Sequence, residues 1–205
     1  MMRHLAFSTL LLLFLTGCRV YYPNHTQQDY KKADTVIPNP YFADLNDERL
    51  YRATIRFYKK EFSGMFVAKR INQQEHRIVL TSDLGNTLFD MTIAKDKHQV
   101  NYIMPDLNKK IIINMLVKDF RTLTQVNYPI TYQDSSSRQF LSTMDGKRYF
   151  LDLNNQGKLA KIETASKYKS KLKIQLSTDS IGKLDKFSML HHGIKLQMEF
   201  VNIPF

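Results

Sequence analysis

"IKLQMEFV", residues 194 to 201, alternates apolar and polar side chains along most of its length. Successive side chains of a β-strand point to opposite faces, so this pattern predicts a strand with one buried face and one face in water. "KLKIQL", residues 171 to 176, repeats the alternation. Strands that are wet on one side are typical of antiparallel sheets, and the two stretches together therefore predict such a sheet.

The same period of two, rich in β-branched and aromatic residues, recurs along most of the chain. Turn-forming residues such as Asn72, Gly85 and Asp96 separate the segments. The predicted strands cover residues 50–58, 62–71, 76–82, 87–95, 99–104, 148–153, 159–164, 172–176 and 194–201. With 43% hydrophobic and 12% aromatic residues among 205, the chain can bury a sizeable core.

Residues 107 to 123 follow a different period. Ile112, Leu116 and Phe120 recur at helical spacing while polar side chains fill the opposite stripe, which predicts an amphipathic helix. Asp106 is the expected N-cap of this helix. The run of isoleucines at 111–113 could instead form a strand. The predicted fold is mainly β (α+β), a strongly curved antiparallel sheet with one or two helices on its concave side.

The N-terminal residues predict export. Arg3 precedes an apolar run over residues 5–15 that is too short to span a bilayer, as in a secretory signal. The Leu-Thr-Gly-Cys that follows resembles the lipobox of bacterial lipoproteins, in which the Cys is acylated after cleavage, and Arg19 in place of Asp favours the outer membrane. We expect a signal peptide over 1–17, a lipidated Cys18 with a tether over 18–45, and a folded domain over 46–205. An ordinary secretion signal with a chance Cys is the alternative.

The chain is strongly basic. Its formal net charge is +11, from 30 Lys and Arg against 19 Asp and Glu. A lipid-anchored envelope protein does not meet nucleic acid, so anionic outer-membrane lipid is the expected partner, and charge that serves only solubility is the alternative. The lysines of "KYKSKLK", residues 167–173, fit the solvent face of a strand; a patch that orients the protein on head groups is the second interpretation.

No sequence pattern predicts catalysis. The chain lacks a Gly-rich phosphate loop and a G-x-S-x-G elbow, and its sole Cys is assigned to lipid. His191 and His192 would point to opposite faces of a strand, which argues against a shared metal. We therefore expect no enzyme, no cofactor and no metal site. An apolar concave face under a helix can be a filled core or a cavity for an apolar ligand.

Three stretches resemble the LolB-like outer-membrane lipoprotein receptors of the LolA/LolB fold family. "HRIVLTSDLGNTLFDMTI", residues 76–93, is similar to the family's strand, Pro-Leu-Gly turn and second strand, with Asp83 at the position of the proline. "STMDGKRYFLDLNNQGKLAKIE" resembles the later hairpins, and "IKLQMEFVNI" resembles the closing strand. The resemblance implies a half-open antiparallel β-barrel with a helical lid over an apolar cavity.

The resemblance also implies a function. In that family the cavity accepts the acyl chains of a lipoprotein from a LolA-like periplasmic carrier, and a protruding leucine, matched here by Leu84, enters the membrane and assists release. The implied protein is a monomeric acceptor on the periplasmic face of the outer membrane. The residues expected to line the cavity are Phe89, Met91, Ile112, Leu116, Phe120, Leu172, Ile174, Leu176, Leu196, Met198 and Phe200. The alternatives are a structural or assembly lipoprotein that binds a protein partner, and a carrier of another amphiphile such as a glycolipid.

Overall fold

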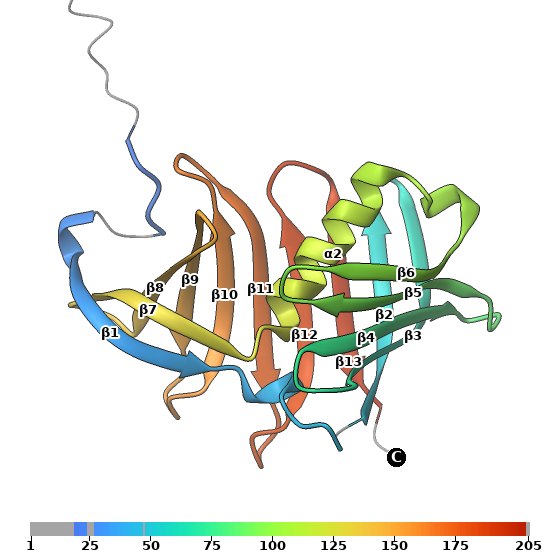
Figure 1. Ribbon diagram of the computed structural model, residues 1–205, viewed down its shortest axis with the longest axis horizontal. Coiled ribbons are helices and arrows are strands. Elements are labelled where there is room, and N and C mark those ends of the chain that lie inside the picture. The colour runs from blue at the N-terminus through green and yellow to red at the C-terminus, as the bar shows by residue number, and fades with distance from the viewer. Residues whose placement is uncertain (1–18, 24–26, 47, 204–205) are drawn as a thin grey trace, which may run out of the picture.

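One large antiparallel β-sheet forms the body of the protein (Figure 1). The computed structural model describes residues 19–23, 27–46 and 48–203. Within these residues, 13 strands are hydrogen-bonded in the order β1-β7-β8-β9-β10-β11-β12-β13-β2-β3-β4-β5-β6. Most neighbours in the sheet are also neighbours in sequence, so short turns build most of the fold, and only the β13–β2 and β1–β7 pairs join distant segments.

The elements have the following bounds. The strands are β1 Tyr30–Pro38, β2 Glu48–Phe57, β3 Lys60–Arg70, β4 Glu75–Ser82, β5 Thr87–Ala94, β6 His98–Ile103, β7 Asn127–Asp134, β8 Gln139–Met144, β9 Lys147–Leu153, β10 Leu159–Ala165, β11 Ser170–Thr178, β12 Leu184–His191 and β13 Leu196–Asn202. Helix α2 is Lys110–Thr124, and the short 3₁₀ helices are η2 Gln27–Asp29, η3 Pro40–Phe42 and η4 Pro105–Leu107.

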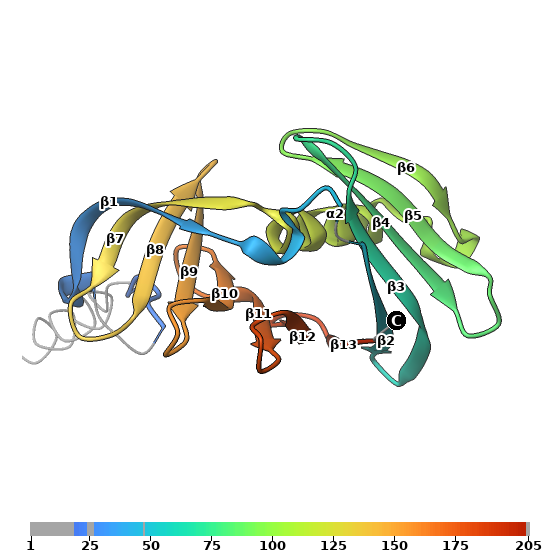
Figure 2. The ribbon, with the colours of Figure 1, turned by 90° about the horizontal axis from the view of Figure 1, so that it is seen from below.

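The sheet curves strongly but does not close into a barrel. Its edge strands β1 and β6 do not pair with each other, and α2 lies in the hollow between the two arms of the sheet (Figure 2). The predicted fold class, a curved half-open antiparallel sheet with a helix on the concave side, is confirmed. No described helix is both long and apolar enough to cross a membrane.

The core fills the concave side of the sheet. Side chains from β2, β3, β4, β5, β11, β12 and β13 join those of α2 in one apolar cluster. Phe187 of β12 and Phe200 of β13 stack at the centre, with ring centroids 4.3 Å apart and planes 11° from parallel. Full burial of such a side chain contributes about 1.5–3 kcal/mol, so the cluster is a main source of stability.

The expected tether over residues 18–45 is wrong for most of its length. Residues 30–38 form β1, which pairs with β7 from Tyr30↔Asp134 to Pro38↔Asn127. Ile37 and the two aromatic residues of η3 belong to the main core cluster. The folded unit therefore begins before the expected boundary at residue 46. Both faces of β1 are largely exposed, so this strand lacks the alternation that predicted the others.

Three further strands were not predicted: β7, β8 and β12. Pro129 interrupts the pattern of β7, and a proline is tolerated there because its missing N–H removes a single ladder bond. The burial of β12 is irregular, with two exposed residues in succession after Leu184. Local alternation is weak in these segments, and long-range pairing decides their structure.

Helix α2 confirms the helical interpretation of residues 107–123 and excludes a strand at 111–113. The expected N-cap is wrong: the cap is Lys109, which makes no side-chain capping bond, and Asp106 lies in η4. Pro105 begins η4 and shifts the start of the helix by several residues.

Gly64 of β3 provides a test of the packing between β3 and β4. A Cβ added there would lie 1.8 Å from the carbonyl oxygen of Thr81, and backbone atoms cannot move away cheaply. We expect Gly64→Ala to lower the free energy of unfolding by about 3 kcal/mol or more. The matched control is Gly193→Ala, where a Cβ meets nothing within 4 Å. Urea unfolding of both variants measures the difference, and equal stabilities would contradict this packing.

Candidate functional site

The turn between β4 and β5 is closed by its own backbone. The amide of Ser82 donates to the carbonyl of Asn86 at 2.8 Å, and the amide of Gly85 donates to the carbonyl of Ser82 at 2.9 Å. Gly85 has φ 83°, a left-handed conformation that side chains with a Cβ disfavour. The glycine therefore permits a tight turn at this point.

Asp83 fixes the turn to the neighbouring strands. Its carboxylate pairs with both terminal nitrogens of Arg52 in β2, each at 3.0 Å, and accepts a hydrogen bond from the Ser63 hydroxyl in β3. Its amide also donates to the carbonyl of Ser63 at 3.3 Å. Paired contacts of this kind hold a loop in one orientation. Asp83 thus makes the turn rigid through its side chain.

Leu84 points out of the turn that these contacts hold. Its exposed fraction is 89%, the largest among the exposed large hydrophobic residues that the structure describes. An apolar side chain left in water forgoes the stabilisation that burial would give. The turn therefore keeps Leu84 in water at a cost to the stability of the fold. An apolar side chain held outward in this way is typical of a surface that contacts another molecule.

The residues expected to line a cavity gather on the concave side. Ten of the eleven are buried in the main cluster, and Ile112 of α2 is partly buried against it. Phe120 of α2 stacks on Phe66 of β3 at 5.3 Å and packs on Phe89 of β5 at 5.7 Å between centroids. Aromatic rings thus fill the space between this part of the helix and the sheet.

Polar contacts fasten the C-terminal half of α2. Arg121 donates to the carbonyls of Ala94 and Lys97 at the β5–β6 turn, at 2.7 and 3.0 Å. The side-chain amide of Asn39 donates to the carbonyl of Leu123 at 2.7 Å and satisfies one of the helix's terminal oxygens. These bonds hold this end of the helix to the β5–β6 turn on one side and to the segment after β1 on the other.

The N-terminal half of α2 is held more weakly. Ile111 is 78% exposed, and Ile112, Ile113 and Met115 are only partly buried. The first turn has no side-chain cap and no acidic residue, and Lys110 stands where the helix dipole favours a negative charge. Fewer buried side chains therefore hold this half of the helix to the sheet than hold the C-terminal half.

One buried polar pair crosses the hollow from α2 to β12. His191 Nε2 lies 2.8 Å from a carboxylate oxygen of Asp119, and Asp119 is 4% exposed. Burial raises the pKa of Asp119, and the hydrogen bond from His191 opposes that shift. His192 is exposed, in agreement with the predicted opposite faces. Among the described residues, no group of three or more His, Cys, Asp or Glu could hold a metal ion.

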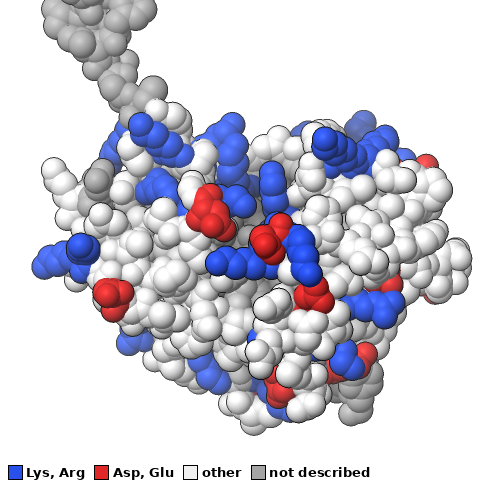
Figure 3. Space-filling model, viewed as in Figure 1, with Lys and Arg blue, Asp and Glu red and all other residues white. Residues whose placement is uncertain are grey.

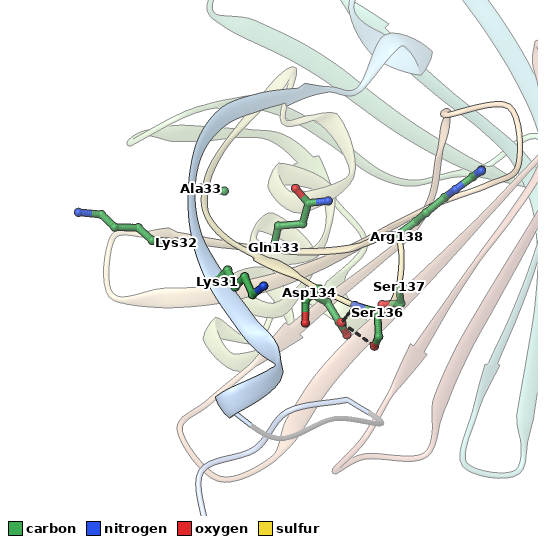
Figure 4. Close-up of a pocket in the computed structure, with 9 residues that line it drawn as sticks. Lys31, Lys32, Ala33, Gln133, Asp134, Ser136, Ser137 and Arg138 are labelled. Carbon is green, nitrogen blue, oxygen red and sulfur yellow. Dashed lines mark hydrogen bonds between the residues drawn. The ribbon is translucent and has the colours of Figure 1, made fainter.

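A polar pocket that the sequence did not indicate lies between β1 and the β7–β8 loop (Figure 4). Its volume is about 510 Å³. Its lining residues are Lys31, Lys32, Ala33, Gln133, Asp134, Ser135, Ser136, Ser137 and Arg138. These side chains are too polar to receive an acyl chain, so the pocket is separate from the apolar concave face. Cys18, the expected lipid attachment site, lies outside the described residues.

Comparisons with known proteins give similarities at low identity. A scan of protein-family models and a search of curated proteins find no match. Among solved structures, a LolA superfamily protein from Nitrosomonas europaea has a TM-score of 0.46 and 9% identity, with 82% of this chain and 87% of that chain covered.

Two further solved structures are similar to this chain. A DUF1329 family protein from Desulfovibrio piger has a TM-score of 0.41 and 9% identity, over 78% of this chain and 85% of that chain. A Vibrio parahaemolyticus domain described as outer-membrane lipoprotein-sorting has a TM-score of 0.42 and 6% identity, over 77% and 83%. At such values these likenesses assign neither a family nor a function.

The contact of α2 with the sheet can be tested at Phe120, which is fully buried. Phe120→Ala removes a ring that stacks on Phe66, so we expect the free energy of unfolding to fall by about 3–5 kcal/mol. Ile111→Ala, on the exposed side of the same helix, should change it by no more than about 0.5 kcal/mol. Chemical denaturation of the two variants makes the measurement. A small effect of Phe120→Ala would mean that α2 does not pack as described.

Proposed function

We propose that this protein is a lipid-anchored acceptor that takes lipoproteins from a soluble periplasmic carrier and inserts them into the outer membrane. It acts without covalent chemistry, enzymatic activity or a cofactor. The proposal rests on the sequence resemblance to LolB-like receptors together with one structural observation. That observation is the presentation of Leu84, 89% exposed, on a turn that Asp83, Arg52 and Ser63 hold in place.

An exposed leucine on a rigid turn suits contact with a bilayer. Leucine enters hydrocarbon favourably, whereas the Asp83 carboxylate beside it stays paired with Arg52 at the surface of the domain. A flexible loop would lose conformational entropy when it inserted, and a preformed turn avoids most of that cost. Leu84 would therefore perturb the membrane locally while the domain remains outside it.

The concave face is the proposed acyl site. Its lining is apolar, and dispersion and hydrophobic contacts such as Phe66 with Phe120 are ones that an acyl chain can replace. Cargo would enter beneath the N-terminal half of α2, where Ile112, Ile113 and Met115 are only partly buried. The C-terminal half would stay attached through Arg121, and the helix would act as a hinged cover.

The filled concave face favours a second candidate function. In this structure the rings of α2 and the sheet occupy the space that cargo would need. A structural lipoprotein that binds a protein partner would keep such a core permanently closed. Binding of a fluorescent triacylated lipopeptide separates the two candidates, because only an acceptor binds it, and it binds in competition with a free fatty acid.

Leu84→Glu tests the insertion role. A carboxylate enters hydrocarbon only at a large desolvation cost, so transfer of lipopeptide to liposomes should fall severalfold while cargo stays bound to the protein. Stability should remain within about 0.5 kcal/mol, because Leu84 is exposed. Melting and transfer are measured on the same preparation.

The matched control is Ile181→Glu. Ile181 is 73% exposed in the turn between β11 and β12, at the other end of the strands. Ile181→Glu introduces the same charge at a similarly exposed apolar position and should leave the transfer of lipopeptide to liposomes unchanged. Equal losses in both variants, or full transfer by Leu84→Glu, would refute the role of Leu84.

A further inference from the structure

The residues that follow Cys18 are attached to the sheet. The amide of Tyr21 donates to the carbonyl of Lys167 at 2.9 Å, and Arg148 Nη1 donates to the carbonyl of Tyr21 at 2.8 Å. The Tyr21 hydroxyl donates to the buried Glu163 carboxylate. Burial and this contact raise the pKa of Tyr21 to about 12, so the hydroxyl keeps its proton at neutral pH. Residue 21 is thus fixed beside the end of β10.

Aromatic contacts strengthen this attachment. The guanidinium of Arg148 lies 4.5 Å from the ring centroid of Tyr22 and 4.9 Å from that of Phe150. Tyr22 also packs against Tyr30 at 5.0 Å, and both rings belong to or contact the second apolar cluster of the domain. Cation–π contacts of this kind contribute about 0.5–1 kcal/mol at partly exposed sites. Tyr21 and Tyr22 are therefore attached to the folded domain and are not part of a free spacer.

The attachment of Tyr21 limits how far an acyl anchor at position 18 could lie from one rim of the sheet. Only two residues separate Cys18 from Tyr21, whose amide binds Lys167 in the β10–β11 turn. An extended chain covers at most about 3.3–3.6 Å per residue, so an acyl anchor at position 18 would be limited to roughly 10–11 Å from Tyr21. Acyl chains on Cys18 would hold the β10–β11 turn close to the lipid head groups.

The turns on this rim come from several parts of the chain. The strand registers put the β2–β3, β4–β5, β8–β9, β10–β11 and β12–β13 turns at the same end of the strands. β6 ends beside the start of β5, through the pair Phe89↔Ile103, so α2 begins at this end too. Leu84, the N-terminus of α2 and the β10–β11 turn therefore lie at the same end of the strands, although the twist of the sheet directs the β4–β5 turn to the right in Figure 1 and the β10–β11 turn upward.

The rim carries unpaired positive charge. In Figure 3, Lys and Arg side chains gather along the upper edge of the molecule, whereas most acidic side chains lie lower. Six exposed lysines of the rim form no salt bridge with any acidic residue that the structure describes; they are Lys59, Lys60, Lys110, Lys167, Lys169 and Lys195. Tyr58, Ile111 and Tyr168 stand among them with exposed fractions of 63%, 78% and 54%.

We infer that this rim is a membrane-docking surface for anionic lipid. Lysines among exposed aromatic and aliphatic side chains match a bilayer interface, where the charges meet phosphate groups and the rings lie at head-group level. The acyl anchor supplies the attachment, and the rim sets the orientation, with the β10–β11 and β12–β13 turns and the weakly held end of α2 toward the membrane. The inference rests on the lipid anchoring of the proposed function and does not depend on the cargo.

Vesicle binding tests the charge of the rim. The protein used is the processed chain beginning at position 18 with Cys18→Ala, which cannot be acylated. It should bind vesicles of phosphatidylglycerol and phosphatidylethanolamine, and bind phosphatidylcholine vesicles much more weakly. Lys167→Glu/Lys169→Glu should weaken binding about thirtyfold or more, since each lysine near an anionic surface contributes roughly fivefold. Added salt should reduce the difference.

The control pair is Lys183→Glu/Lys186→Glu, two exposed lysines at the opposite end of the strands. It changes the net charge equally and should cost far less affinity. If the first pair lowers the melting temperature, Lys59→Glu/Lys60→Glu replaces it. Equal losses in rim and control pairs, or no preference for anionic vesicles, would overturn the inference. Loss of docking with normal lipopeptide binding would leave the acceptor function standing.

A single-tryptophan probe tests the orientation, because the chain contains no Trp. Tyr168→Trp on the rim should shift its emission to the blue and be quenched by brominated lipid when the protein binds anionic vesicles. Tyr132→Trp is the control, since Tyr132 of β7 is 42% exposed away from these turns. Quenching of both probes, or of Tyr132→Trp alone, would contradict the orientation.

Discussion

The packing of α2 in the hollow of the sheet is the interaction on which the rest of the structure depends. An open sheet of this size would leave the apolar inner faces of β3, β5 and β13 in water, because its edges β1 and β6 do not meet. Phe120 brings an aromatic ring into contact with Phe66 and Phe89 and covers that surface. The same contacts are the ones with which any apolar ligand of the concave face has to compete.

That packing is uneven along the helix, and the unevenness has a physical origin. Toward the C-terminus, buried side chains act together with the bonds of Arg121 and Asn39. Toward the N-terminus there is no cap, and Lys110 opposes the helix dipole. Opening from the N-terminal side therefore breaks fewer contacts. That side also lies at the end of the strands that carries the β10–β11 turn.

The ion pair in the turn that carries Leu84 fixes the geometry of the turn more than it stabilises the fold. The pair between Asp83 and Arg52 is exposed on both sides, and exposed ion pairs contribute only about 0–1 kcal/mol. Its effect is to fix the direction in which the turn projects, because two nitrogens of one guanidinium meet two oxygens of one carboxylate. A turn of this kind keeps an apolar side chain in water, which a flexible loop would tend to fold back onto the domain.

Much of this protein follows from local sequence alone. Alternation in segments such as 171–176 and 194–201 predicted an antiparallel sheet and the side chains that face inward. In such a strand only one of the two faces is apolar, so only that face can be buried. Helical spacing in the same way selected Phe120 and Leu116 for the core. The resemblance to the LolB-like turn also led us to expect that Leu84 protrudes, and its side chain is exposed.

Tertiary structure alone decided the contacts between residues that are distant in sequence. Arg52 reaches Asp83 across 31 positions, and Tyr21 reaches Glu163 across 142, which no local pattern encodes. The same holds for β1, whose exposed edge needs no alternation and which became a strand only by pairing with β7. Whether the concave face is closed was likewise set in three dimensions, because an apolar stripe on a helix specifies that it packs but not how completely it fills the space beneath it.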